Sequence, residues 1–132
     1  MSAFSNKTEA AIVDHFLRGV EVPVSGDLYL GLFTADPGES GFANEATYEG
    51  YARVLITFTE IDENGNTSNA EALLFPANVS QVDQTIAAAA VYDSADVRDG
   101  NQVIHGGLID AKTLSFNDLM SFPVGSLVLK VN

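Results

Sequence analysis

Alternation of apolar and polar positions dominates the chain from about residue 27 onward, and a period of two is typical of β-strands. Within residues 27–34 the alternating positions are apolar on both sides, which predicts a strand buried on both faces. Within residues 51–59 the apolar positions fall mainly on one side, which predicts a strand with a single buried face. The apolar side of this second strand consists of Ala52, Val54, Ile56 and Phe58.

Similar stretches recur between turn signals through the rest of the chain. Asn64-Gly65 predicts a tight hairpin turn, Gly106-Gly107 predicts a bulge or a close backbone approach, and Pro123-Val124-Gly125 predicts a turn. The regular spacing of the strands predicts a mainly β protein, with an antiparallel β-sandwich or jelly-roll-like architecture. The further strands are expected at 68–75, 85–93, 102–109, 113–116, 119–122 and 126–131.

One helix is expected before the strands, over about residues 7–18. Ile12 and Phe16 recur at helical spacing and share a face, Asn6 is the expected N-cap, and Gly19 is the expected stop. A face of this kind normally docks on an apolar surface. We expect Ile12 and Phe16 to contact either the sandwich or a neighbouring subunit.

Length and charge narrow the classes of partner. The 132 residues predict a single domain over 1–132, and 18 acidic against 6 basic side chains give a net charge of −12. This charge argues against free nucleic acid and against an anionic membrane as partners. The sequence also has no apolar run near the ~20 residues of a membrane-spanning helix, and its first residues do not predict secretion.

Candidate catalytic groups are sparse. The two histidines, His15 and His105, are far apart in the sequence, and no Gly-x-Ser-x-Gly elbow accompanies His105-Gly106-Gly107. Without cysteine, zinc-thiolate sites are excluded. Asp62 precedes the Asn-Gly step and superficially resembles the start of a calcium loop, but the spacing of the glycine favours the hairpin turn. A calcium ion held between acidic residues of different loops is an alternative that the sequence leaves open. We therefore expect no enzyme activity, no cofactor and no assigned metal site.

Arg53 is the most informative charged residue. It follows a long acidic loop over residues 35–50, which contains Glu39, Glu45 and Glu49, in a chain with few basic side chains. Arginine recognises carboxylates through paired N–H donors and cannot act as a base. We expect an Arg53–Glu45 ion pair that holds the loop in shape, and we prefer this structural role to a catalytic one.

The order of several short segments resembles a widespread group of small tailed-phage virion proteins that are often labelled phage tail fibre proteins. The resemblance covers nearly the whole chain, although the alanine run at residues 87–90 departs from the pattern. The segments that carry it are Ser5-Asn6-Lys7-Thr8-Glu9, Tyr29-Leu30-Gly31-Leu32-Phe33-Thr34-Ala35-Asp36-Pro37, Glu45, Gly50-Tyr51-Ala52-Arg53, Ala89-Ala90-Val91-Tyr92-Asp93-Ser94-Ala95, His105-Gly106-Gly107-Leu108 and Phe122-Pro123-Val124-Gly125-Ser126-Leu127.

The resemblance implies a non-enzymatic virion structural protein, assembled in the host cytoplasm. Our first hypothesis is that the protein is a capsid decoration or cement protein on the capsid surface, which binds the major capsid protein and forms a homotrimer. The alternatives are a tail fibre or appendage subunit, and a carbohydrate-binding module for host attachment. A sugar site would need exposed aromatic rings, for which the candidates are Phe42 and Tyr48, because the chain has no tryptophan.

Overall fold

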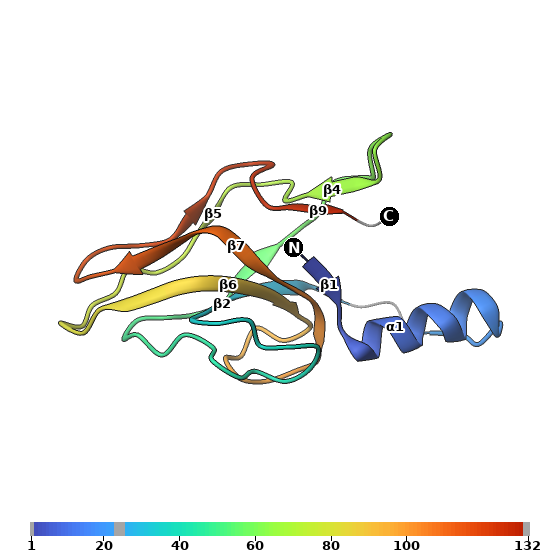
Figure 1. Ribbon diagram of the computed structural model, residues 1–132, viewed down its shortest axis with the longest axis horizontal. Coiled ribbons are helices and arrows are strands. Elements are labelled where there is room, and N and C mark those ends of the chain that lie inside the picture. Colours follow the sequence, from blue (N-terminus) through green and yellow to red (C-terminus); the bar gives the residue numbers. More distant parts are fainter. Residues whose placement is uncertain (1, 23–25, 131–132) are drawn as a thin grey trace.

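The computed structural model describes residues 2–22 and 26–130, and it shows a mainly β protein with one helical segment near its N-terminus (Figure 1). All strand pairs in the described part are antiparallel. The predicted fold class is confirmed. In chain order the elements are β1 (Ser2–Phe4), α1 (Asn6–Ile12), the π-helical turn η1 (Val13–Leu17), β2 (Leu28–Phe33), β3 (Val54–Ile56), β4 (Asn66–Ser68), β5 (Leu73–Leu74), β6 (Gln84–Tyr92), β7 (Gln102–Leu114), β8 (Ser121–Phe122) and β9 (Val128–Lys130).

The strands form one large sheet and two ribbons. The large sheet has five strands in the order β1-β7-β6-β2-β3, and the ribbons are β4–β9 and β5–β8. The ribbons lie over one face of the large sheet (Figure 1). The main hydrophobic core lies between these two layers and includes Leu30, Leu32, Ile56, Leu73, Phe75, Ile86, Val91, Ile104, Leu114, Met120 and Phe122.

The opposite face of the large sheet also buries side chains. Phe33 of β2 and Tyr92 of β6 are 0% exposed there, beside Ala88 and Ala90. Because Leu32 of β2 lies in the main core while its neighbour Phe33 lies on this second face, β2 is buried on both sides, as predicted. The alanines of β6 leave the room that the larger rings of this face occupy.

The helical segment begins and ends close to the prediction, but its N-cap differs. Ser5, not Asn6, is the N-cap, and its hydroxyl accepts a hydrogen bond from the Thr8 N–H at 3.2 Å. The physical reason is that the backbone at Ser5 is extended, since it follows a strand, whereas Asn6 is already helical. Gly19, with φ +67°, follows the last turn as expected. Neither helical segment in the described part has the length and apolar content that a bilayer-crossing helix requires.

Several strand boundaries depart from the predictions. Strands do not begin at about residue 27, because β1 already pairs Ser2 with Gly106 at the edge of the large sheet. The strand predicted over 51–59 is reduced to β3, because beyond it the chain leaves the large sheet: the Ala70 N–H donates to the Thr57 carbonyl within the next hairpin. Before β3, Arg53 is buried although it lies on the predicted polar side.

Of the strands predicted later in the chain, two are joined into one in the structure and another is divided into two. The two strands predicted over 102–109 and 113–116 are the single strand β7, with an irregularity after Gly107 where the pairing partner changes from Ala88 to Ile86. The break in register thus directly follows the double glycine, from which a bulge or a close backbone approach was predicted. The strand predicted over 68–75 is split into β4 and β5, which belong to different ribbons. The last residue of the strand predicted over 126–131 lies outside the described residues.

Candidate functional site

The long loop between β2 and β3 lies against the second face of the large sheet and is tied to it by polar contacts. Gln102 of β7 donates to the Gly38 carbonyl at 3.0 Å, and Tyr92 of β6 donates to the Gly41 carbonyl. The third contact joins His105 Nδ1 to the Asp36 carboxylate of the loop, at 2.7 Å. The loop therefore covers the sheet as a fixed layer.

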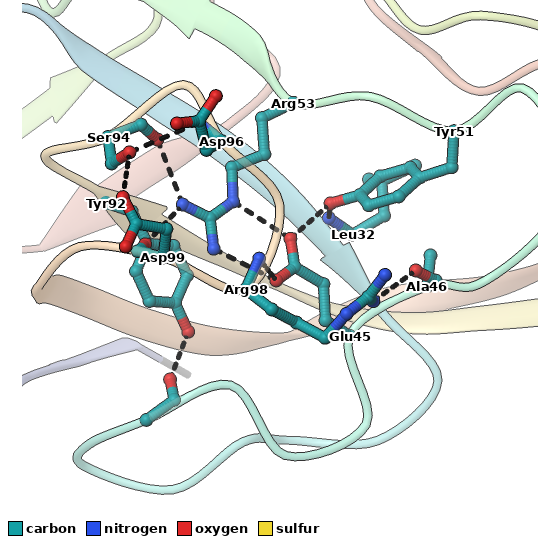
Figure 2. A network of polar contacts seen from close by, with 11 residues as sticks. Leu32, Glu45, Ala46, Tyr51, Arg53, Tyr92, Ser94, Asp96, Arg98 and Asp99 are labelled. Atoms are coloured by element: carbon teal, nitrogen blue, oxygen red, sulfur yellow. Dashed lines mark hydrogen bonds and ion pairs between the residues drawn. The ribbon is translucent and has the colours of Figure 1, made fainter.

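An arginine and a glutamate pair beneath this layer, as Figure 2 shows. Arg53 Nε lies 2.9 Å from Glu45 Oε2, and Arg53 Nη2 lies 2.9 Å from Glu45 Oε1, so the contact is bidentate. Both side chains have no exposed surface. A buried charge pair of this geometry is costly to break, because removing one partner leaves the other unpaired away from water.

Glu45 has two further donors that complete its surroundings. The Tyr51 hydroxyl donates to Oε2 at 2.7 Å, and the Arg98 backbone N–H donates to Oε1 at 2.9 Å. Gly31 leaves the space for this cluster, since a Cβ there would lie 3.0 Å from Glu45 Oε2 and 3.1 Å from the Tyr51 hydroxyl oxygen. The Tyr51 oxygen in turn accepts the Leu32 N–H, which joins the cluster to β2.

Arg53 also holds the acidic turn between β6 and β7. Its Nη1 donates to the carbonyls of Ser94 and Asp99 at 2.9 and 2.8 Å. Arg98 of the same turn has φ +56° and donates from its side chain to the Ala46 carbonyl. The positive φ places the Arg98 N–H toward Glu45, so the turn and the long loop are joined in both directions (Figure 2).

The electrostatics favour the charged forms of both partners. Burial opposes ionisation of Glu45, but the hydrogen bonds from Arg53 and Tyr51 and the charge of Arg53 outweigh it, so the pKa of Glu45 lies below its usual value. Burial likewise opposes the charge on Arg53, and Glu45 overcomes it, so the pKa of Arg53 lies above its usual value. Burial and the Glu45 carboxylate raise the pKa of Tyr51, which keeps its hydroxyl as a donor.

The two aromatic side chains predicted as a sugar site pack against other parts of the protein. Tyr48 is 6% exposed and donates to the Pro76 carbonyl at 2.8 Å. Phe42 is half-buried, with its ring 5.5 Å from that of Tyr92 and 5.7 Å from the guanidinium carbon of Arg53. The two side chains thus have different partners within the protein. The expectation that Tyr48 offers an exposed ring is wrong, because its hydroxyl bonds the Pro76 carbonyl and its ring is buried.

Ile12 and Phe16, the candidate interaction residues of the helical segment, lie apart from the Arg53–Glu45 cluster. Ile12 is 38% exposed and Phe16 is 75% exposed, so the sandwich does not cover the face that they share. Of the two contacts expected for this face, the one with the sandwich is wrong, because the helix runs away from the sheets (Figure 1). The contact with a neighbouring subunit stays a prediction.

The remaining candidate chemistry has structural partners. His15 lies on the exposed helix beside Phe16, while His105 contacts Asp36 under the loop, so the two imidazoles do not form one site. Asp62 accepts the backbone N–H groups of Asn64 and Asn66, as a turn requires, and Gly65 has φ +80°. In the described part of the chain, no three acidic or histidine side chains are grouped to hold a metal ion.

Sequence reasoning missed three members of the cluster. The pattern places Tyr51 and Tyr92 in strands and Arg98 in an acidic turn, so nothing local marks them as partners of the Arg53–Glu45 pair. One signal was present: Gly31 interrupts a buried strand of large residues, and a glycine there indicates close approach by another group.

Two comparisons with known proteins bear on this arrangement. The model of one family, described as podophage GP4 fiber I protein gp80, matches residues 3–130. This span includes the helix, the long loop and every residue of the Arg53–Glu45 cluster. No curated protein matches the chain.

Proposed function

Because the chain belongs to the family of podophage GP4 fiber I protein gp80, which matches residues 3–130, we propose that it is a structural subunit of a phage tail fibre or a related tail appendage. That match is the observation that carries the proposal. It covers the whole fold rather than one segment, so the role is assigned to the protein as a folded unit. The protein is a component of the virion.

The geometry supports a role that depends on shape. The most elaborate polar cluster, around Arg53 and Glu45, is buried and satisfied by the protein's own groups. Such a cluster stabilises a loop but offers no open position for a substrate. A fibre subunit must keep its shape outside the cell, and fixed loops serve that requirement.

A capsid decoration protein bound to the major capsid protein is the competing assignment, and the name of the family favours the tail. A carbohydrate-binding module based on Phe42 and Tyr48 has less support. Stacking on a sugar needs a free ring face, while Tyr48 is buried and Phe42 packs beside Tyr92.

The location can be tested on purified phage particles. We expect antibodies against the protein, visualised with gold by electron microscopy, to label the tail or its appendages, and we expect mass spectrometry to find a few copies per particle. Label over the head, with copies near the number of local three-fold axes of the shell, would replace the proposal with capsid decoration. Absence of the protein from particles would contradict both assignments.

A further inference from the structure

The N-terminal helical segment carries an apolar face that the described residues of the chain leave uncovered. No residue of α1 or η1 is buried. Within the described residues, the segment is anchored at its base, where Ser5 donates to the Gln102 carbonyl, Thr8 donates to the Val103 carbonyl and the Asn6 N–H donates to the Glu39 carbonyl. We call residues 6–18 the arm. Its exposed apolar side chains are Ile12 at 38%, Val13 at 44%, Phe16 at 75% and Leu17 at 78%.

The second half of the arm is π-helical, and this sharpens the apolar face. The Arg18 N–H bonds the Val13 carbonyl, five residues back, so the turn is wider than in an α-helix. In the wider turn, residues four apart lie closer to one line along the helix. Ile12 aligns with Phe16, and Val13 aligns with Leu17, which is the anchor spacing of helices that bind in grooves.

An apolar groove of about 700 Å³ lies between the large sheet and β9. Its floor and walls are formed mainly by core side chains of the two layers, and it is open to solvent. An apolar space of this size and lining is suited to side chains rather than to water. The side chains that define it include Leu30, Val91, Ile104, Phe122, Leu127 and Leu129.

Charge indicates which kind of partner suits these two surfaces. The chain carries −12, so two copies repel each other over most of their surface. The arm is an exception: Lys7 and Arg18 balance Glu9 and Asp14, so residues 6–18 are neutral with histidine uncharged. The groove lining is also balanced, because it contains one acid, Asp110, and one base, Lys130. Arm and groove are therefore surfaces through which two copies can meet without this repulsion.

We propose that the arm of one copy binds in the groove of a second copy of the same chain, with Ile12 and Phe16 as the buried anchors. Each copy then offers one arm and one groove, so the contact is head-to-tail and closes into a ring when the rotation allows. A ring of three copies would be the homotrimer predicted from the sequence. This assembly goes beyond the tail assignment and does not depend on it.

Cross-linking tests the contact directly, because the natural chain has no cysteine. A Phe16→Cys chain is mixed with a size-tagged Val128→Cys chain, since Val128 lines the groove and is 56% exposed. The matched control pairs Phe16→Cys with Val82→Cys, which is 74% exposed and outside the groove. We expect at least about tenfold more mixed disulfide from the groove pair, because a disulfide needs Cβ atoms ~4 Å apart.

The mass of the assembly in solution provides the second measurement. The 132-residue chain should form a species of fixed size above 14.0 kDa, and Phe16→Glu should return it to a monomer that still unfolds cooperatively on heating. Val82→Glu, a change at an equally exposed valine, should leave the assembly intact. A monomer at every concentration, or an assembly that Phe16→Glu leaves intact, overturns the proposal. A disulfide within one chain that carries both Phe16→Cys and Val128→Cys overturns it as well. None of these results would move the protein from the tail, so the two proposals fail separately.

Discussion

The guanidinium carbon of Arg53 lies 4.0 Å from the centroid of the Tyr92 ring, so the charge that holds the long loop is stacked on an aromatic side chain of the central strand β6. The same ring donates its hydroxyl proton to the Gly41 carbonyl of that loop. Tyr92 thus supports the loop twice, once through Arg53 and once directly. A cation over an aromatic face is worth up to ~2 kcal/mol when water is excluded.

Replacing Arg53 should destabilise the protein strongly. Arg53→Ala leaves the Glu45 carboxylate buried without its main partner, so we expect a loss of ~3–5 kcal/mol in the free energy of unfolding, measured by urea denaturation. Arg18→Ala is the matched control, because Arg18 pairs with Asp14 on the exposed arm and such pairs contribute less than ~1 kcal/mol. Equal stabilities of the two variants would refute the role of Arg53 in holding the loop.

The pKa of Glu45 predicts an acid dependence of stability. The pKa in the folded protein lies below the usual value of 4.5, so the unfolded chain binds more protons in this range. The stabilisation is complete above pH 4.5 and is lost as the pH falls through the lower pKa of the folded protein. Urea denaturation from pH 7 to pH 3 should show this loss, and Glu45→Gln should lack that part of it. A Glu45→Gln profile parallel to the natural one would contradict the assignment.

The buried tyrosines predict a second limit at alkaline pH. Burial raises the pKa of Tyr48 and of Tyr92 to about 12 each, above the usual value of 10. Their contribution is fully present below pH 10 and is lost as the pH rises through about 12. The part of the tyrosinate absorbance that comes from Tyr48 and Tyr92 should therefore rise late and together with loss of the fold. Tyr92→Phe should remove its share of this rise, and an early, gradual ionisation of Tyr92 in the folded protein would disprove its burial.

Adding one methyl group at Gly31 should disturb the cluster. The Cβ of Gly31→Ala would lie 3.0 Å from Glu45 Oε2 and 3.1 Å from the Tyr51 hydroxyl oxygen, in a region where neither can retreat without losing a hydrogen bond. We expect a loss of ~1–3 kcal/mol, which is typical of overpacking, measured by thermal denaturation. Gly107→Ala is the control, because a Cβ there has no neighbour within 4 Å. An unchanged stability of Gly31→Ala would mean that the Glu45 and Tyr51 side chains can shift to make room for the methyl group.

Salt should strengthen the association of copies. Each chain carries −12, and the repulsion between exposed charges is screened beyond ~8 Å at physiological ionic strength but only beyond ~30 Å at 0.01 M. Sedimentation equilibrium across this range should therefore show tighter assembly at higher salt. Weaker assembly at higher salt would mean that attraction between charges holds the copies together, contrary to the neutral arm and groove.

The sequence was sufficient for the mainly β fold class and for the pairing of Arg53 with a loop carboxylate, because both follow from local patterns. Periodicity identifies β2, and a rare basic residue after an acidic loop indicates an ion pair. It was insufficient where partners are distant: Arg98 reaches Glu45 across 53 positions, and β1 is too short to show a period. The exposure of Phe16 could not be predicted either, since an amphipathic helix has the same sequence pattern whether its apolar face packs against its own chain or against another.

The anchoring of the arm has a consequence for the time course of biosynthesis. Ser5, at the base of the arm, bonds the backbone of Gln102, 97 positions later in the chain. Ribosomes add ~5–20 residues per second, so the arm leaves the ribosome on the order of 5–20 s before its attachment point exists. During that interval Ile12 and Phe16 are apolar, exposed and unanchored on a growing chain. Nascent chains crowded on one messenger are therefore at risk of premature aggregation through this segment.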